Sequence, residues 1–98
     1  MAFLYITVGR ATSNTGAQAL VGPILGQQKI AITGAATPSS AFHGSARLVR
    51  VHVDGDGACS IAVGPGAVAT TDDMRLAPNQ TEYFGINDGD VISVIANT

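Results

Sequence analysis

Arg47-Leu48-Val49-Arg50-Val51-His52-Val53 is the clearest β-strand pattern in the chain. Its three valines fall on one face of an extended strand, and Leu48, Arg50 and His52 fall on the other. Similar short β-rich runs recur from Ser40 to Ile95, separated by clusters of Gly, Asp, Asn and Pro. Close spacing of this kind is typical of a small antiparallel β-sandwich or barrel.

The same pattern, followed along all 98 residues, predicts seven or eight strands and no segment with a helical period. We therefore expect one domain, 1–98, folded as an all-β, antiparallel, jelly-roll-like β-sandwich. Gly22-Pro23 places the second strand at a sheet edge or breaks it, because proline cannot donate to a ladder. The expected strands are Ala2–Val8, Ala17–Leu25, Gln27–Thr33, a short extended piece at Ser40–Phe42, Arg47–Val53, Ala58–Val63, Thr81–Ile86 and Val91–Ala96.

Three connections between these strands carry further expectations. Asp54-Gly55-Asp56-Gly57 fits a tight hairpin turn, whose two central residues need positive φ, so Arg47–Val53 is expected to pair with Ala58–Val63. Asn87-Asp88-Gly89-Asp90 is expected to close a final hairpin in the same way. The segment from Gly64 to Asn79 is expected to be a half-buried loop anchored by Met74 and Leu76.

The charge content is low for a soluble domain. Asp, Glu, Lys and Arg make up 12% of the residues, against about 25% in typical soluble domains, while 46% are hydrophobic. The net charge of −2 gives no electrostatic reason to expect a nucleic acid partner. The apolar run at Met1–Ile6 is far too short to span a membrane, so no membrane partner is expected. Coverage of apolar surface by other subunits is the better explanation of this composition, which favours a homo-oligomer, with a trimer as one form.

No catalytic or metal-binding set is evident. Cys59 alternates with Ile61 and Val63 and is expected to be a buried, inert thiol. Asp54-Gly55-Asp56-Gly57 resembles the start of a calcium loop, but an EF-hand needs an oxygen donor where Ala58 stands and a bidentate Glu where Pro65 stands. We therefore expect no bound metal and no cofactor.

The remaining titratable residues give no stronger signal. His43 and His52 have no metal-ligand spacing with each other or with Cys59. The neighbouring carboxylates of Asp72-Asp73 and of the loop 87–90 are interpreted as solvated turn acids. No strand-turn-helix nucleophile motif is present, so the chain is not expected to be an enzyme.

The order of several elements resembles that of small proteins encoded by tailed bacteriophages and prophages, typically beside the head genes. The resemblance covers nearly the whole chain and is stronger in its C-terminal part. One departure is Gly66-Ala67-Val68-Ala69, where Pro-Thr-Ala-Thr is the commoner loop. The elements that carry it are Ser40–Phe42, Leu48–Val53, Cys59–Gly64, Ala67–Asp73, Leu76–Gly85 and Val91–Ile95.

The resemblance implies a virion structural protein that decorates or cements the capsid, with the major capsid protein or other virion proteins as partners. It implies a place on the capsid surface after synthesis in the bacterial cytoplasm, and it carries no catalytic residues. Candidate subunit-contact residues are Phe42, Tyr83 and Phe84, although most of the five aromatic residues are expected in the core. The alternatives are a tail or head–tail junction component, or a module that binds a host-surface glycan or receptor.

Overall fold

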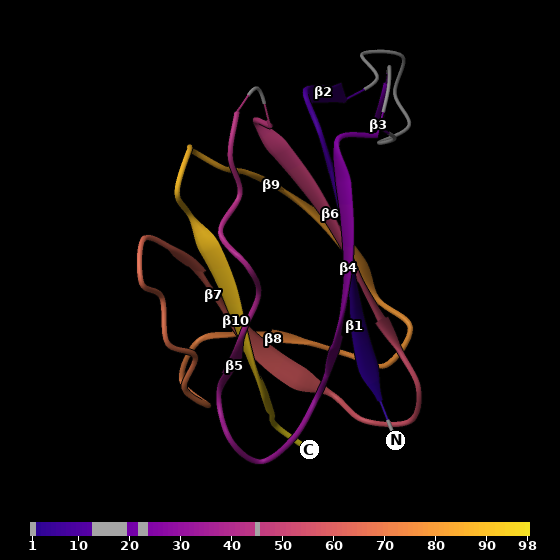
Figure 1. Cartoon of the computed structure of the whole chain (residues 1–98). Helices are drawn as coiled ribbons and strands as arrows, with labels where there is room; N and C mark the ends of the chain where they lie inside the picture. The colour runs from indigo at the N-terminus through magenta and orange to yellow at the C-terminus, as the bar shows by residue number, and fades with distance from the viewer. Residues whose placement is uncertain (1, 13–19, 22–23, 45) are drawn as a thin grey trace.

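Two antiparallel sheets of four strands each pack face to face in the computed structural model, which describes residues 2–12, 20–21, 24–44 and 46–98 (Figure 1). Sheet I has the strand order β4-β1-β6-β9, and sheet II has the order β5-β10-β7-β8. No helix occurs among the described residues, so the predicted all-β sandwich is confirmed. The strands are β1 (Phe3–Gly9), β2 (Ala11–Thr12), β3 (Leu20–Val21), β4 (Gly26–Ala31), β5 (Thr37–Pro38), β6 (Leu48–Asp54), β7 (Cys59–Gly64), β8 (Met74–Leu76), β9 (Thr81–Gly85) and β10 (Val91–Ala96).

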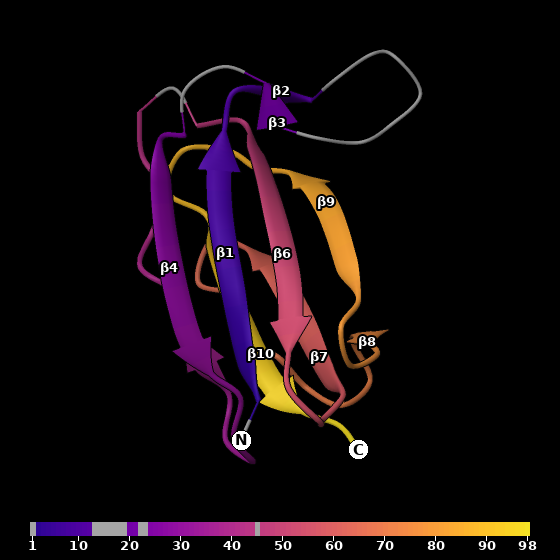
Figure 2. The ribbon, with the colours of Figure 1, turned by 90° about the vertical axis from the view of Figure 1, so that its right-hand side faces the viewer.

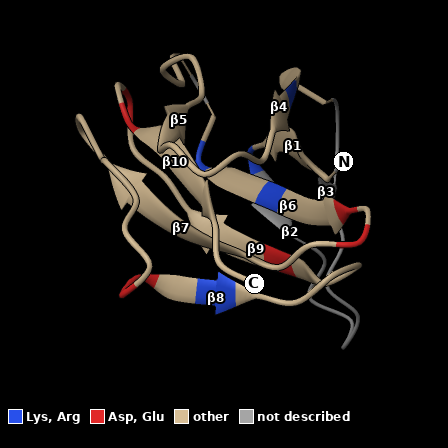
Figure 3. Ribbon diagram, turned by 90° about the horizontal axis from the view of Figure 1, so that it is seen from below, with Lys and Arg blue, Asp and Glu red and all other residues tan. Residues whose placement is uncertain are grey.

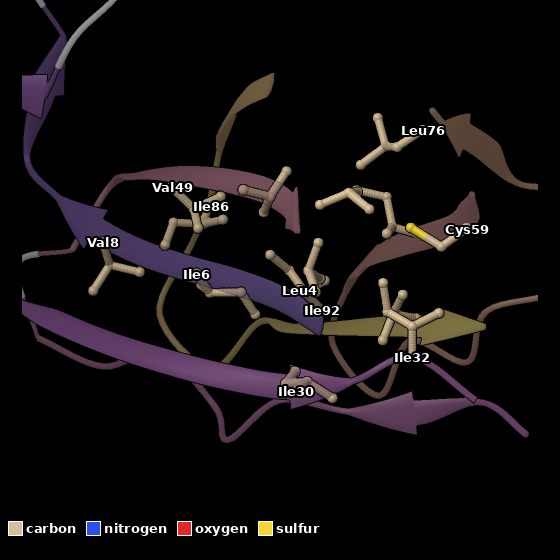
Figure 4. Close-up of a cluster of buried hydrophobic side chains, with 14 of the residues drawn as sticks. Leu4, Ile6, Val8, Ile30, Ile32, Val49, Cys59, Leu76, Ile86 and Ile92 are labelled. Atoms are coloured by element: carbon tan, nitrogen blue, oxygen red, sulfur yellow. The ribbon is translucent and has the colours of Figure 1, made fainter. Parts of the chain in front are cut away.

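The core lies between the two sheets and is built from alternate residues of each strand. In β6 the predicted inward face is confirmed, because Val49, Val51 and Val53 are completely buried. Sheet II meets them with Ile92 and Val94 of β10, which are also completely buried. Figure 4 shows how these aliphatic side chains interdigitate, with the Cys59 sulfur among them. The other buried members are Ala2, Leu4, Ile6, Val8, Ile30, Ile32, Phe42, Ala46, Ile61, Leu76 and Ile86.

The eight strands of the two sheets form four nested antiparallel pairs, which is the arrangement of a jelly roll. The innermost pair is β7 with β8, followed by β6 with β9, β5 with β10, and β4 with β1. In a simple jelly roll the outermost partner of β4 would follow β10 at the end of the chain. Here that partner is β1, so the fold is jelly-roll-like with its last strand moved to the front.

The expected hairpin at 54–57 is wrong, because β6 and β7 lie in different sheets. Both edges of β6 are already occupied, one by β1 and the other by β9. Within 54–57 only Gly55 has a positive φ, of 129°, whereas the predicted turn needs two successive residues in that region. The segment is therefore an exposed to half-buried connection that leads the chain from sheet I to sheet II.

The expected final hairpin across Asn87–Asp90 is also wrong, since β9 belongs to sheet I and β10 to sheet II. This connection closes on itself, because the Asn87 N–H donates to the Asp90 carboxylate at 2.9 Å. It is also tied to the segment before β6, where Phe42 N–H donates to Asp90 O at 2.9 Å and Gly89 N–H donates to Phe42 O at 2.7 Å. The ladder groups of the two strands are used elsewhere, because β9 pairs with β6 and β10 pairs with β5 and β7.

Three smaller expectations differ from the structure, and a fourth lies mostly outside the described residues. Ser40–Phe42 is not a strand, and the pairing with β10 is made earlier, by Thr37–Pro38. The expected loop from Gly64 to Asn79 contains β8, in which Leu76 is buried while Met74 is 53% exposed. Most of Ala17–Leu25 lies outside the described residues, although Leu20–Val21 is strand β3. Its partner β2 falls in the expected loop 10–16, of which residues 13–16 are not described.

The permuted strand order predicts that the chain can be reconnected. Ala2 and Thr98 both reach Gly57, with side-chain carbons 3.8 and 3.7 Å from the point that a Cβ would occupy at that glycine. A circular permutant that joins Thr98 to Ala2 by a short Gly/Ser linker and opens between β2 and β3 keeps every ladder of both sheets. We expect it to retain the β-sheet circular dichroism spectrum and cooperative thermal unfolding. A permutant opened between Arg50 and Val51 is the control and should not fold; equal loss of structure in both permutants would contradict the prediction.

Candidate interaction surface

The residues that could support chemistry are scattered. The described part of the chain contains no pocket and no group of three or more His, Cys, Asp or Glu residues placed to hold a metal ion. His43 forms an exposed pair with Asp88 at 3.4 Å, and such surface pairs contribute little to stability. His52 lies on the outer face of β6, where its Nδ1 is 2.7 Å from the Thr81 hydroxyl. The outer surfaces of the two sheets are therefore the features to compare.

The outer face of sheet II is covered by the chain itself. Ser60 and Ser93 point outward from β7 and β10, yet both are almost completely buried. The N–H of Ala69, in the loop between β7 and β8, donates to the Ser93 hydroxyl at 2.9 Å. The Asn97 side-chain amide donates to the Ser60 hydroxyl at 2.9 Å and to Thr71 O at 3.1 Å. This loop is thus held over sheet II by hydrogen bonds, of which the one from Ala69 to Ser93 is buried.

The outer face of sheet I is not covered in this way. In Figure 2 no described segment crosses in front of β1 and β6. We call this surface the open face. It is defined by six exposed or half-buried residues, namely Phe3, Tyr5, Lys29, Arg50, His52 and Tyr83.

The open face combines aromatic rings with cations. Lys29 Nζ lies 4.2 Å from the centre of the Phe3 ring and 5.6 Å from that of Tyr5, distances at which a cation is attracted to a ring face. Arg50 is directly opposite Tyr83 in the β6–β9 ladder. Figure 3 shows Lys and Arg on strands β4, β6 and β8, whereas most acidic residues lie in loops. A chain with a net charge of −2 therefore presents a face that carries two cations among its rings.

The structure separates the three predicted contact residues. Phe42 is only 4% exposed and belongs to the core, so its ring is covered within the chain. Phe84 points inward and packs against the core while remaining partly exposed. Tyr83 alone of the three lies on the open face. The expectation that most aromatic residues lie in the core is wrong, because Phe3 and Tyr5 also point outward, where the alternation of β1 places them.

Cys59 is completely buried, as predicted. Burial raises the pKa of its thiol from 9.0 to about 11, partly offset by the nearby Arg75 guanidinium, which favours the thiolate. Thiols react as thiolates, so a buried group that resists ionisation is a poor nucleophile. This residue belongs to the packing of β7 rather than to a reactive site.

Comparisons with known proteins add no relative. A scan against models of known protein families matches none of them, and neither curated protein sequences nor solved structures show significant similarity to the chain. The described residues also include no helix that is long and apolar enough to cross a membrane.

Replacing Ser93 by Ala should release the loop that covers sheet II. The change removes the acceptor of a buried N–H at Ala69, which typically costs about 1–3 kcal/mol. We expect a lower urea midpoint and faster proteolytic cleavage between β7 and β8. The same change at exposed Ser40 is the control and should alter stability by about 0.5 kcal/mol or less. Equal midpoints for the two variants would contradict this role of Ser93.

Cys59 should make stability depend on pH in the alkaline range. The native thiol ionises only near pH 11, whereas the unfolded thiol ionises near 9.0, so the stability linked to the neutral thiol is complete below pH 9.0 and lost towards pH 11. The loss approaches about 3 kcal/mol for a shift of this size. The difference in unfolding free energy between wild type and Cys59→Ala, measured by urea titration on both sides of pH 9.0, isolates this effect. A difference that is constant with pH would refute it.

Proposed function

We propose that this chain is a structural protein of a tailed-bacteriophage virion, which decorates or cements the capsid through contacts between protein surfaces. The order of its sequence elements resembles that of such proteins. Its all-β, jelly-roll-like fold is compatible with this role, although a fold alone does not determine function. The major capsid protein is the proposed main partner, and the capsid surface is the proposed location.

The contrast between the two sheets carries the proposal. Sheet II is covered by its own loop, whereas the open face leaves Tyr5, Tyr83 and Arg50 available for contact. Tyrosine and arginine are enriched in protein–protein interfaces, where they supply a large share of the binding energy. A broad face of this kind suits another folded surface better than it suits a small molecule, which is usually bound in a concave site.

Two other roles remain as candidates. A tail or head–tail junction component would use the same surface at a few copies per particle. A glycan-binding module is favoured by one observation, namely that Tyr5 and Tyr83 present rings on the same face as His52 and Arg50. Specific binding to a glycan array that is abolished by Tyr5→Ala would support the glycan-binding role over the capsid role.

The virion role has a direct test. Mass spectrometry of purified particles should find the chain in an amount comparable to that of the major capsid protein, whereas a tail component would be far scarcer. Tyr5→Ala should weaken rebinding to particles that lack the protein by about tenfold or more, because it removes a ring from the centre of the open face. Val68→Ala, an exposed substitution in the loop over sheet II, is the control and should bind as wild type does. Absence of the chain from particles would overturn the proposal.

A further inference from the structure

The edge of β9 is the feature that carries an inference beyond this role. Two backbone bonds that flank the β6–β9 ladder fix its phase, since Ile86 N–H donates to Arg47 O at 2.8 Å and Val53 N–H donates to Gln80 O at 3.0 Å. In an antiparallel ladder, residues alternate between bonding to one neighbour and pointing away from it. The even-numbered residues of β9 therefore bond to β6. Thr81, Tyr83 and Gly85 direct their N–H and C=O groups to the other side, where no described strand pairs with them.

The two edges nearest to each other in the fold, β4 and β5, have features that discourage pairing. In β4, exposed Lys29 is one of the residues whose backbone N–H and C=O groups point away from β1. A charged residue at such a position opposes strand addition. The Gln28 side chain of β4 also bonds to both backbone groups of Ser40, at 2.8 and 3.3 Å. β5 is two residues long and contains Pro38, which cannot donate to a ladder.

The third edge, β8, is also poorly suited to pairing, and β9 differs from all three. β8 is three residues long and has Arg75 at its centre, held by a bond from its Nε to Asn97 O at 3.0 Å. β9 is five residues long. The three residues whose backbone groups point away from β6, Thr81, Tyr83 and Gly85, are uncharged. Glu82, the one charge of β9, points to the inner face, a placement that by itself opposes pairing, but its carboxylate is already engaged by the Gln80 side chain, which donates to it at 2.9 Å. Natural proteins usually block exposed edges, so an unblocked edge indicates a pairing site.

We propose that β9 pairs antiparallel with β9 of a second copy of this chain. A two-fold axis perpendicular to sheet I places Tyr83 opposite its own copy, with Thr81 opposite Gly85 of the partner. Each of these pairs exchanges two N–H···O=C bonds, so every outward-directed group of the strand is satisfied. The result is one continuous sheet with the order β4-β1-β6-β9-β9-β6-β1-β4.

The side chains of β9 are compatible with this register. The two Tyr83 rings lie on the same face, at the separation of a hydrogen-bonded pair, where cross-strand aromatic contacts are favourable. Gly85 leaves room for the Thr81 side chain of the other copy. On the inner face Glu82 meets Phe84 rather than a second Glu82, so no like charges stand directly opposite each other. Within β9, this register therefore satisfies the edge without placing like charges directly opposite each other.

The pairing also joins the two open faces on one side of the dimer. Tyr5 and Arg50 of both copies would then face the same way. The dimer could therefore attach to a partner surface at two equivalent points. A single five-residue strand makes a short interface, so the dimer should form in a concentration-dependent way. The inference stands on the geometry of β9 and holds whether or not the chain occurs in virions.

Sedimentation velocity of the whole chain tests the proposal. From about 10 µM to about 1 mM, wild type should shift towards twice the 9.9 kDa mass of one chain. Tyr83→Lys places a charge on the edge and should remain a monomer. Gln27→Lys is the matched control, because it adds the same charge on the same face at the opposite edge, and it should dimerise as wild type does. A wild type that stays monomeric throughout, or loss of dimer in both variants, would overturn the proposal.

Amide hydrogen exchange on wild type gives an independent readout that needs no substitution. In the dimer the N–H groups of Thr81, Tyr83 and Gly85 become protected as concentration rises. Those of Glu82 and Phe84 are protected at every concentration, because they bond to β6. Exchange of the three odd-numbered amides that is fast and independent of concentration would exclude pairing through β9, including in a larger oligomer built through another surface.

Discussion

Val49, Val51 and Val53 of β6 have no exposed surface, and they lie where sheet I meets sheet II. Full burial of an aliphatic side chain of this size contributes about 1.5–3 kcal/mol, so these three residues favour one orientation of β6 strongly. Once β6 is placed with β1 and β9 on its two sides, neither edge can accept a further strand. β7 must then cross to the opposite sheet. The alternation between the sheets that defines this fold follows from that constraint.

The positions of the longer strands could be predicted from the sequence, but their partners could not. The two-residue period of β6 identifies its buried face, and it does so equally well for β1 in Leu4, Ile6 and Val8. It contains no information on which strand lies beside which, because that choice depends on contacts between residues far apart in the chain. Gly55 illustrates the ambiguity. An Asp-Gly pair suits a two-residue hairpin, and it also suits a connection between the two sheets. The short strand β5 could not be predicted, because two residues are too few to show a period.

The candidate surface was predictable only in part, for a different reason. The alternation of β1 places Phe3 and Tyr5 on the face opposite Leu4, but their apolar character favours a core position. Their exposure is made tolerable by Lys29, whose ammonium group lies over both rings. The burial of Ser93 could not be predicted, because it depends on where the loop containing Ala69 returns. Both features depend on tertiary neighbours that a local pattern does not contain.

The buried polar side chains in the described part of the chain are paired within the chain. Among the described residues, no buried side-chain nitrogen or oxygen lacks a hydrogen-bond partner. A saturated interior of this kind stabilises the fold, because a buried polar group without a partner costs free energy. Charged residues are also few, so long-range electrostatic attraction can contribute little to the choice of a partner. The contacts proposed above therefore depend on the shape of sheet I, on the rings of the open face and on the hydrogen-bonding groups along the edge of β9.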